Sequence, residues 1–117
     1  MSPFDALLSE KDLLAQVREL AETLGYRVYH THDSRRSEPG FPDLVIAGHG
    51  RLWFVELKSQ QGRVTAPQRE WLGALAATGA QTRVWRPSDW AALAEELGGS
   101  AIASTLQAGP QRGIPLA

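Results

Sequence analysis

The chain has 117 residues, a length typical of one compact domain and too short for two independently folded ones. Its composition is 43% hydrophobic and 21% charged, as in soluble globular proteins, and no apolar run reaches the ~20 residues needed to cross a bilayer. A membrane role is thereby excluded, residues 1–9 do not resemble a signal peptide, and the lack of cysteine excludes disulfides and thiolate metal sites. We therefore expect a cytoplasmic protein.

The net charge of −1 conceals an uneven distribution of charge along the chain. Residues 1–25 carry a net charge of −3, whereas residues 26–86 hold nine basic and five acidic residues and are at +4. Ten of the twelve basic residues are arginine, whose planar guanidinium suits bidentate contacts with phosphate. The basic middle segment suits a nucleic-acid partner, although a solvated surface with ordinary ion pairs would explain the same charges.

The first expected element is a helix over residues 10–24. Ser9 and Asp12 have the spacing of a capping box, and Gly25 supplies a stop signal. Between them, apolar residues recur at helical spacing, namely Leu13, Val17, Leu20 and Leu24. Residues 26–31 are rich in β-branched and aromatic side chains and predict a strand, and the polar residues 32–39 predict a loop.

Residues 44–47 and 52–58 are two apolar runs that predict strands. The glycine-bearing segment 48–51 between them has the length of a hairpin connection, so the two strands should pair antiparallel.

The remaining elements alternate helix, strand and helix. Thr65 and Gln68 form a second capping-box pattern with Pro67 in the first turn, which predicts a helix ending at Gly79. Residues 81–85 predict a strand, parallel to 52–58 because the intervening connection is long enough for a crossover. Ser88 is expected to cap a third helix over residues 89–97, closed by Gly98-Gly99.

These elements predict an α/β fold in the order α-β-β-β-α-β-α, with a central mixed sheet flanked by helices. We expect residues 1–99 to form a single domain. Residues 100–117 contain glycine and proline and are weakly patterned, which favours a C-terminal tail that is either flexible or docked on a partner subunit.

Glu56 and Lys58 stand two residues apart on a predicted strand that is otherwise almost wholly apolar, so they share one face of it. Asp43 begins the preceding strand, and the short hairpin should bring it alongside Glu56. Two converging carboxylates form a pocket of hard oxygen atoms suited to Mg²⁺, with a lysine beside it. An exposed ion pair of little energetic value would explain Glu-x-Lys alone. The apolar strand and the hairpin spacing to Asp43 favour the site.

Pro42-Asp43 followed by Glu56-Leu57-Lys58 resembles the signature of the PD-(D/E)xK nuclease superfamily. A wider string resembles its virus-type replication–repair branch, the VRR-NUC domain. The matching residues are Gly40-Phe-Pro-Asp-Leu44, Phe54-Val-Glu-Leu-Lys58, Gly62, Gln68 and Trp71-Leu72. The similarity spans roughly residues 9–87. The short motif is permissive, whereas the extended string is fairly specific.

The resemblance implies a restriction-endonuclease-like core and assigns roles to the matching residues. Asp43 and Glu56 would be metal ligands, the Leu57 carbonyl a further ligand, and Lys58 the catalytic lysine. Gln68 would face the metal site, although its position also suits simple helix capping. Many relatives add an acidic residue from the first helix, for which Glu10 is the candidate, with Glu19 and Glu22 as fallbacks on what could equally be a solvated helix face.

The same resemblance implies Mg²⁺-dependent hydrolysis of phosphodiester bonds in DNA, with Mn²⁺ as a possible substitute. Stand-alone members of this size resemble homodimeric endonucleases that cut branched DNA such as four-way (Holliday) junctions, in keeping with a role in DNA repair in a bacterium or a phage. One minimal domain offers one cut, so opposed cuts would need two subunits. Three alternatives stay open: a nuclease on flaps or duplex ends, a non-catalytic DNA-binding or assembly module, and an interaction protein unrelated to nucleic acid.

Arginines around the motif are candidate phosphate contacts, although loop arginines are commonly solvated. They are Arg35 and Arg36 in the polar loop, and Arg63 after the motif strand. The histidines His30, His32 and His49 have no convincing zinc spacing, so sheet-edge and loop roles are favoured. The four tryptophans are expected in the core or an interface rather than stacked on bases. Gly48-His-Gly50 lacks the lysine and following helix of a phosphate-binding loop, which argues against a nucleotide cofactor.

Overall fold

The computed structural model describes residues 3–32 and 38–108 of the chain. In chain order the elements are η1 (Asp5–Leu7), α1 (Glu10–Thr23), β1 (Arg27–His30), β2 (Leu44–Gly48), β3 (Arg51–Leu57), α2 (Ala66–Ala77), β4 (Gln81–Trp85), η2 (Pro87–Asp89) and α3 (Trp90–Ala108). Each predicted strand and helix is present, in the expected order. Within the described ranges, no helix combines the length and apolar character needed to cross a membrane.

The four strands form one mixed sheet in the order β1-β2-β3-β4. β1 pairs antiparallel with β2, and β2 with β3, whereas β3 and β4 run parallel, so the predicted hairpin and the predicted parallel pair are both confirmed. The hairpin turns at His49 and Gly50, which both have positive φ, as the tight turns that match the twist of paired strands require. This architecture is the expected restriction-endonuclease-like α/β core.

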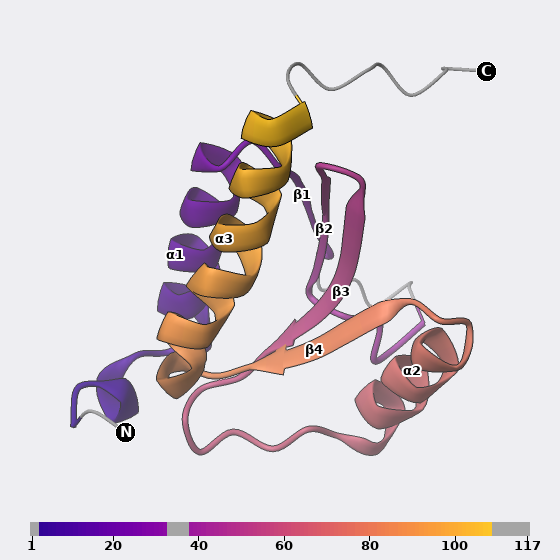
Figure 1. Ribbon diagram of the computed structural model, residues 1–117. Coiled ribbons are helices and arrows are strands. Elements are labelled where there is room, and N and C mark those ends of the chain that lie inside the picture. The colour runs from indigo at the N-terminus through magenta and orange to yellow at the C-terminus, as the bar shows by residue number, and fades with distance from the viewer. Residues whose placement is uncertain (1–2, 33–37, 109–117) are drawn as a thin grey trace.

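Helices α1 and α3 lie on one face of the sheet, and α2 lies against β4 on the other side (Figure 1). The core fills the space between helices α1 and α3 and the sheet. Its members from the helices are Leu13, Val17, Ala21, Leu93 and Leu97, and those from the strands include Leu44, Ile46, Trp53, Val55 and Leu57. Since burial of such apolar side chains is the main driving force of folding, this layer holds the sheet in place.

The third helix departs from the sequence prediction at both ends. Ser88 does not cap it: Ser88 lies in η2, and its hydroxyl accepts a hydrogen bond from the Gln60 side chain at 3.0 Å. Nor does the helix end at Gly98-Gly99, because α3 continues to Ala108. Leu97 is fully buried, and Gly98 packs against Leu24, the residue that follows α1. This packing outweighs the roughly 1 kcal/mol that each helical glycine costs relative to alanine.

Candidate metal centre and active site

The β2–β3 hairpin brings Asp43 and Glu56 together at one end of the sheet. Leu44 pairs with Val55, so Asp43 falls opposite Glu56 as the sequence predicts. The Asp43 carboxylate accepts a hydrogen bond from the Leu57 backbone N–H at 2.8 Å, which fixes its direction. On the other side, the Thr31 backbone N–H donates to the Asp43 carbonyl at 2.8 Å. Asp43 is therefore held from both neighbouring strands.

Glu10 completes the cluster from the first residue of α1. Ser9 and Asp12 cap this helix reciprocally, as predicted, and so leave the neighbouring Glu10 carboxylate free of the capping bonds. One carboxylate oxygen from each of Glu10, Asp43 and Glu56 lies within 4.8 Å of the other two. The fallback candidates Glu19 and Glu22 are not in this cluster of described residues, and Glu22 forms an ion pair with Arg18 at 3.4 Å.

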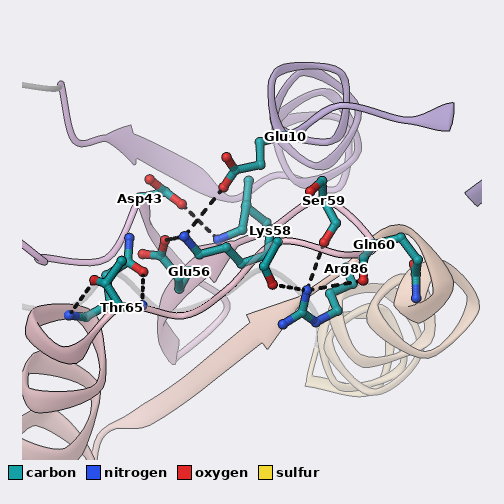
Figure 2. A network of polar contacts seen from close by, with 11 residues as sticks. Glu10, Asp43, Glu56, Lys58, Ser59, Gln60, Thr65 and Arg86 are labelled. Carbon is teal, nitrogen blue, oxygen red and sulfur yellow. Dashed lines mark hydrogen bonds and ion pairs between the residues drawn. The ribbon is translucent and has the colours of Figure 1, made fainter. Parts of the chain in front are cut away.

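Lys58 stands inside the carboxylate cluster and is almost fully buried (Figure 2). Its Nζ lies 3.6 Å from Glu56 Oε2 and 3.8 Å from Glu10 Oε1. Glu56 and Lys58 share a face of the strand end, as the sequence predicts, whereas Val55 and Leu57 are buried in the core on the opposite face. A buried ammonium group surrounded by carboxylates provides a positive charge next to any phosphate that enters.

Glu56 has an unusual protonation equilibrium because it is buried. Desolvation, reinforced by the negative charge of Asp43, raises the pKa of Glu56 to about 8, although the Lys58 ammonium opposes the shift. Its Oε1 atom is buried and has no hydrogen-bond partner among the described residues. Such an orphaned buried oxygen is costly unless something else satisfies it, and a cation would do so.

These residues fit a divalent cation. The three converging groups are carboxylates, the hard oxygen ligands that Mg²⁺ and similar ions prefer, and one of them keeps an unsatisfied oxygen atom. Glu10, Asp43 and Glu56 would hold the ion. The predicted contribution of the Leu57 carbonyl stays a prediction, since what the structure shows of Leu57 is its N–H bond to Asp43.

The N-terminus of α2 places Gln68 in the same cleft. Gln68 Oε1 accepts the Thr65 backbone N–H at 2.8 Å, and Thr65 Oγ1 accepts the Gln68 N–H at 3.3 Å. Gln68 is therefore a capping residue and a cleft-lining residue at once. Gly40, with φ of +93°, packs so closely on this turn that a Cβ there would lie 2.5 Å from the Pro67 backbone carbon. The segment leading to Asp43 is thus packed directly against the start of α2.

Arg86 anchors the segment that follows Lys58. Its Nη1 group donates to three backbone carbonyls, those of Ser59 at 2.8 Å, Gln60 at 3.3 Å and Gly62 at 2.7 Å (Figure 2). The Gln60 side chain adds a pair of hydrogen bonds to Ser88, both of 3.0 Å. The turn after the lysine is consequently tied to the end of β4. Reasoning from sequence missed Arg86, because no local pattern shows which carbonyls a distant arginine will reach.

The cleft beside the cluster has a volume of about 1120 Å³. Five of the site residues predicted from sequence line it, together with aromatic side chains that the prediction left out; the five are Glu10, Asp43, Glu56, Lys58 and Gln68. Its aromatic and imidazole rings come from Tyr29, His30, His32, Phe41 and Trp71. His30 and His32 occupy the expected strand and loop positions, with ring centroids 5.3 Å apart, yet both face this cleft. The alternation of residues along β1 is the signal that could have pointed to Tyr29.

The arginines predicted to bind phosphate do not all fall within the structure described. Arg35 and Arg36 lie outside the described residues. Arg63 is exposed and is not among the residues that line the cleft, so the structure does not bring it to the carboxylate cluster. Its role as a phosphate contact stays a prediction.

Comparison with known proteins identifies the family. The VRR-NUC domain model matches residues 5–107. A solved structure described as a VRR_NUC domain protein superposes with a TM-score of 0.61 at 19% identity, covering 78% of this chain and 91% of its own. A second, described as a VRR_NUC domain, gives a TM-score of 0.54 at 26% identity, covering 66% of this chain and 84% of its own. The search of curated proteins gave no match. Since the family model covers most of its length, the chain belongs to the VRR-NUC family of nuclease domains.

Proposed function

We propose that this nuclease domain is a Mg²⁺-dependent DNA endonuclease whose active site is the cluster of Glu10, Asp43, Glu56 and Lys58. The observation that carries the proposal is the meeting of three carboxylates within 4.8 Å beside a buried lysine. Carboxylates at an ordinary surface are solvated, whereas these lie beside a lysine that is buried and paired with two of them. Mn²⁺ is expected to substitute, because it accepts the same oxygen ligands.

Each residue has a separate task in the proposed hydrolysis. Glu10, Asp43 and Glu56 would hold a Mg²⁺ ion, which when bound would supply an activated water and polarise the phosphate. The Lys58 ammonium lies beside the carboxylates and donates a hydrogen bond to the phosphate oxygen that gains negative charge. Asp43 is oriented by the Leu57 N–H, and the Gln68 amide, whose oxygen is engaged by Thr65, keeps its NH₂ group for the substrate. Arg63 would contact the DNA backbone, as would Arg35 and Arg36.

We propose branched DNA, such as a four-way junction, as the substrate, and a homodimer as the acting form. One site per chain makes one cut, so paired cuts on opposed strands need a second copy related by symmetry. Cutting of flaps or duplex ends is the alternative within the same chemistry. A cytoplasmic location and a bacterial or phage origin stay predictions, as do roles for residues 109–117, which lie outside the described structure.

The test is a cleavage assay on labelled four-way junction, flap, splayed, duplex and single-stranded DNA of shared sequence. Each is incubated with Mg²⁺, Mn²⁺ or EDTA. The variants are Lys58→Ala and Glu10→Gln, with Glu19→Gln as the matched control, because Glu19 is an exposed glutamate of the same helix outside the cluster. Light scattering of the same samples gives the oligomeric state.

Cutting that requires the metal, survives Glu19→Gln and is lost in Lys58→Ala is the expected result. Binding without cutting would instead favour a DNA-binding or assembly module. Neither cutting nor binding would overturn the DNA assignment, and cutting by a monomer would overturn the dimer.

A further inference from the structure

Away from the metal cluster, the described lining of the cleft offers no lysine or arginine to a nucleic-acid backbone. Its described charged residues are the four carboxylates of Glu10, Glu38, Asp43 and Glu56, and the lysine Lys58. No arginine is among the described residues that line it. Three of these carboxylates would hold the cation, which leaves Glu38 as the charged residue on the described part of the wall away from the cluster. Because most affinity for a DNA backbone comes from basic side chains, this part of the wall is suited to another part of the DNA.

Beside its charged residues the cleft has an aromatic wall, which consists of Tyr29, Phe41 and Trp71. The Phe41 ring contacts the edges of Trp71 and Phe54, with centroids 5.1 Å and 6.1 Å apart, so both Phe41 and Trp71 are held in fixed positions. Tyr29 is different, because 61% of its surface is exposed although it lies in a strand. A large ring left open to solvent within a cleft offers a flat apolar surface for a ligand.

Strand register places Tyr29 close to the metal cluster. Tyr29 pairs directly with Val45, and Val45 is two residues from Asp43, so the three side chains share one face of the sheet. The diagonal neighbours Tyr29 and Asp43 are then separated by about 7–8 Å. A DNA strand advances about 3.4 Å per nucleotide along a duplex. The ring of Tyr29 therefore lies about two nucleotides from a phosphate bound at the carboxylates.

We propose that Tyr29, with Trp71 on the neighbouring wall, stacks on an unpaired nucleobase of DNA near the phosphate that is cut. This inference rests on the proposed function and deepens it. Every base has an aromatic face that can stack on a protein ring, and that face becomes available when the base leaves the duplex stack. The aromatic wall thus favours branched DNA, in which bases at the branch point can leave the stack, over uninterrupted duplex DNA.

The test compares Tyr29→Leu and Tyr29→Phe, because leucine keeps apolar bulk without an aromatic face and phenylalanine keeps the face without the hydroxyl. Leu52→Ala is the matched control: Leu52 is exposed, lies on the same face of the sheet and does not line the cleft. Thermal melts establish that all variants are folded. The substrates are a splayed DNA and a fully paired duplex of the same sequence. Each carries 2-aminopurine at the same position, which in the splayed DNA is the unpaired nucleotide next to the branch.

For the splayed substrate, Tyr29→Leu is expected to raise KM roughly tenfold with kcat little changed, the loss typical of one stacked base. Cleavage of the duplex, the Tyr29→Phe variant and the Leu52→Ala variant should show little effect. Addition of wild-type protein should quench the 2-aminopurine fluorescence of the splayed DNA, and Tyr29→Leu should abolish that quenching.

Equal effects of Tyr29→Leu on both substrates, or no effect on either, would overturn the stacking proposal while leaving the nuclease intact. If wild-type protein cut no DNA at all, the proposed function would fail first. The fluorescence measurement would then still decide the stacking proposal, because it requires the protein to bind DNA but not to cut it.

Discussion

Strand β3 presents opposite chemistry on its two faces. Trp53, Val55 and Leu57 point into the core between the sheet and helices α1 and α3, whereas Glu56 and Lys58 lie in the cleft at the other face. Both sets are buried to a similar degree. Burial of the first set stabilises the fold, and burial of the second set costs free energy because it removes charged groups from water. Burial of the apolar face therefore offsets the free energy that burial of the charged site costs.

The largest expected effect comes from Glu56→Gln, which keeps the shape of the side chain and removes its charge. Cleavage should fall about a thousandfold or more, because a ligand to the metal is lost, equivalent to about 4 kcal/mol. The melting temperature of the metal-free protein at pH 8 should rise, since no carboxylate has to be buried. Glu19→Gln is the control. A variant that is inactive but also less stable at pH 8 would contradict the contrast between the two faces.

The second prediction concerns pH and follows from the raised pKa of Glu56. In the unfolded chain this carboxyl loses its proton near pH 4.5, and in the folded protein near pH 8. The contribution of Glu56 to stability is therefore fully present below pH 4.5 and is lost as pH rises to about 8, by at most about 1.4 kcal/mol per pH unit.

Urea denaturation of the metal-free protein across this pH range measures the predicted loss. Added Mg²⁺ should oppose the loss, because a bound cation favours the ionised carboxylate. The Glu56→Gln variant should lack this part of the pH dependence. An identical pH profile for the wild type and the variant would show that Glu56 is not the titrating group.

The third prediction tests the apolar face. Val55→Ala removes two methyl groups from a fully buried position and should cost about 2 kcal/mol of unfolding free energy, with cleavage at 25 °C nearly unchanged. Urea denaturation and steady-state kinetics measure the two quantities on the same sample. Loss of activity in a protein that is still folded would mean that the core and the site are coupled more tightly than the strand geometry implies.

The smallest expected effect is that of Arg86→Ala. Loss of its three carbonyl contacts loosens the turn after Lys58 without touching the carboxylates, so kcat should fall severalfold, equivalent to about 1 kcal/mol. Arg69→Ala is the matched control, since Arg69 is exposed and donates to the single carbonyl of Val64. The pH profile of kcat should keep its shape. A shifted profile would mean that Arg86 acts on the protonation of the site itself.

Sequence patterns predicted most of the fold because its signals are local. The capping boxes at Ser9 and Thr65, the hairpin length and the apolar runs each depend on a few neighbouring residues, and the structure confirms each of them. The continuation of α3 past Gly98-Gly99 was not predicted, because it depends on packing against a distant segment.

For the site, the motif and the hairpin spacing predicted that Asp43, Glu56 and Lys58 lie close together, and the structure brings them together. Glu10 could be named only as one candidate among three, since the approach of α1 to the sheet end is a tertiary contact. Arg86 and the packing of Phe41 on Trp71 escaped prediction for the same reason: the groups that they contact are far away in sequence.

Gly40 shows how a residue can govern a reaction that it does not touch. The backbone at this position packs the segment that leads to Asp43 against the helix that carries Gln68, and any side chain would collide with the Pro67 backbone. In a genetic screen for loss of cleavage, position 40 should score as severely as the carboxylates themselves. A map of intolerant positions would therefore outline this packing contact between the Asp43 segment and α2 as well as the chemistry, and the two classes would separate by their affinity for the metal.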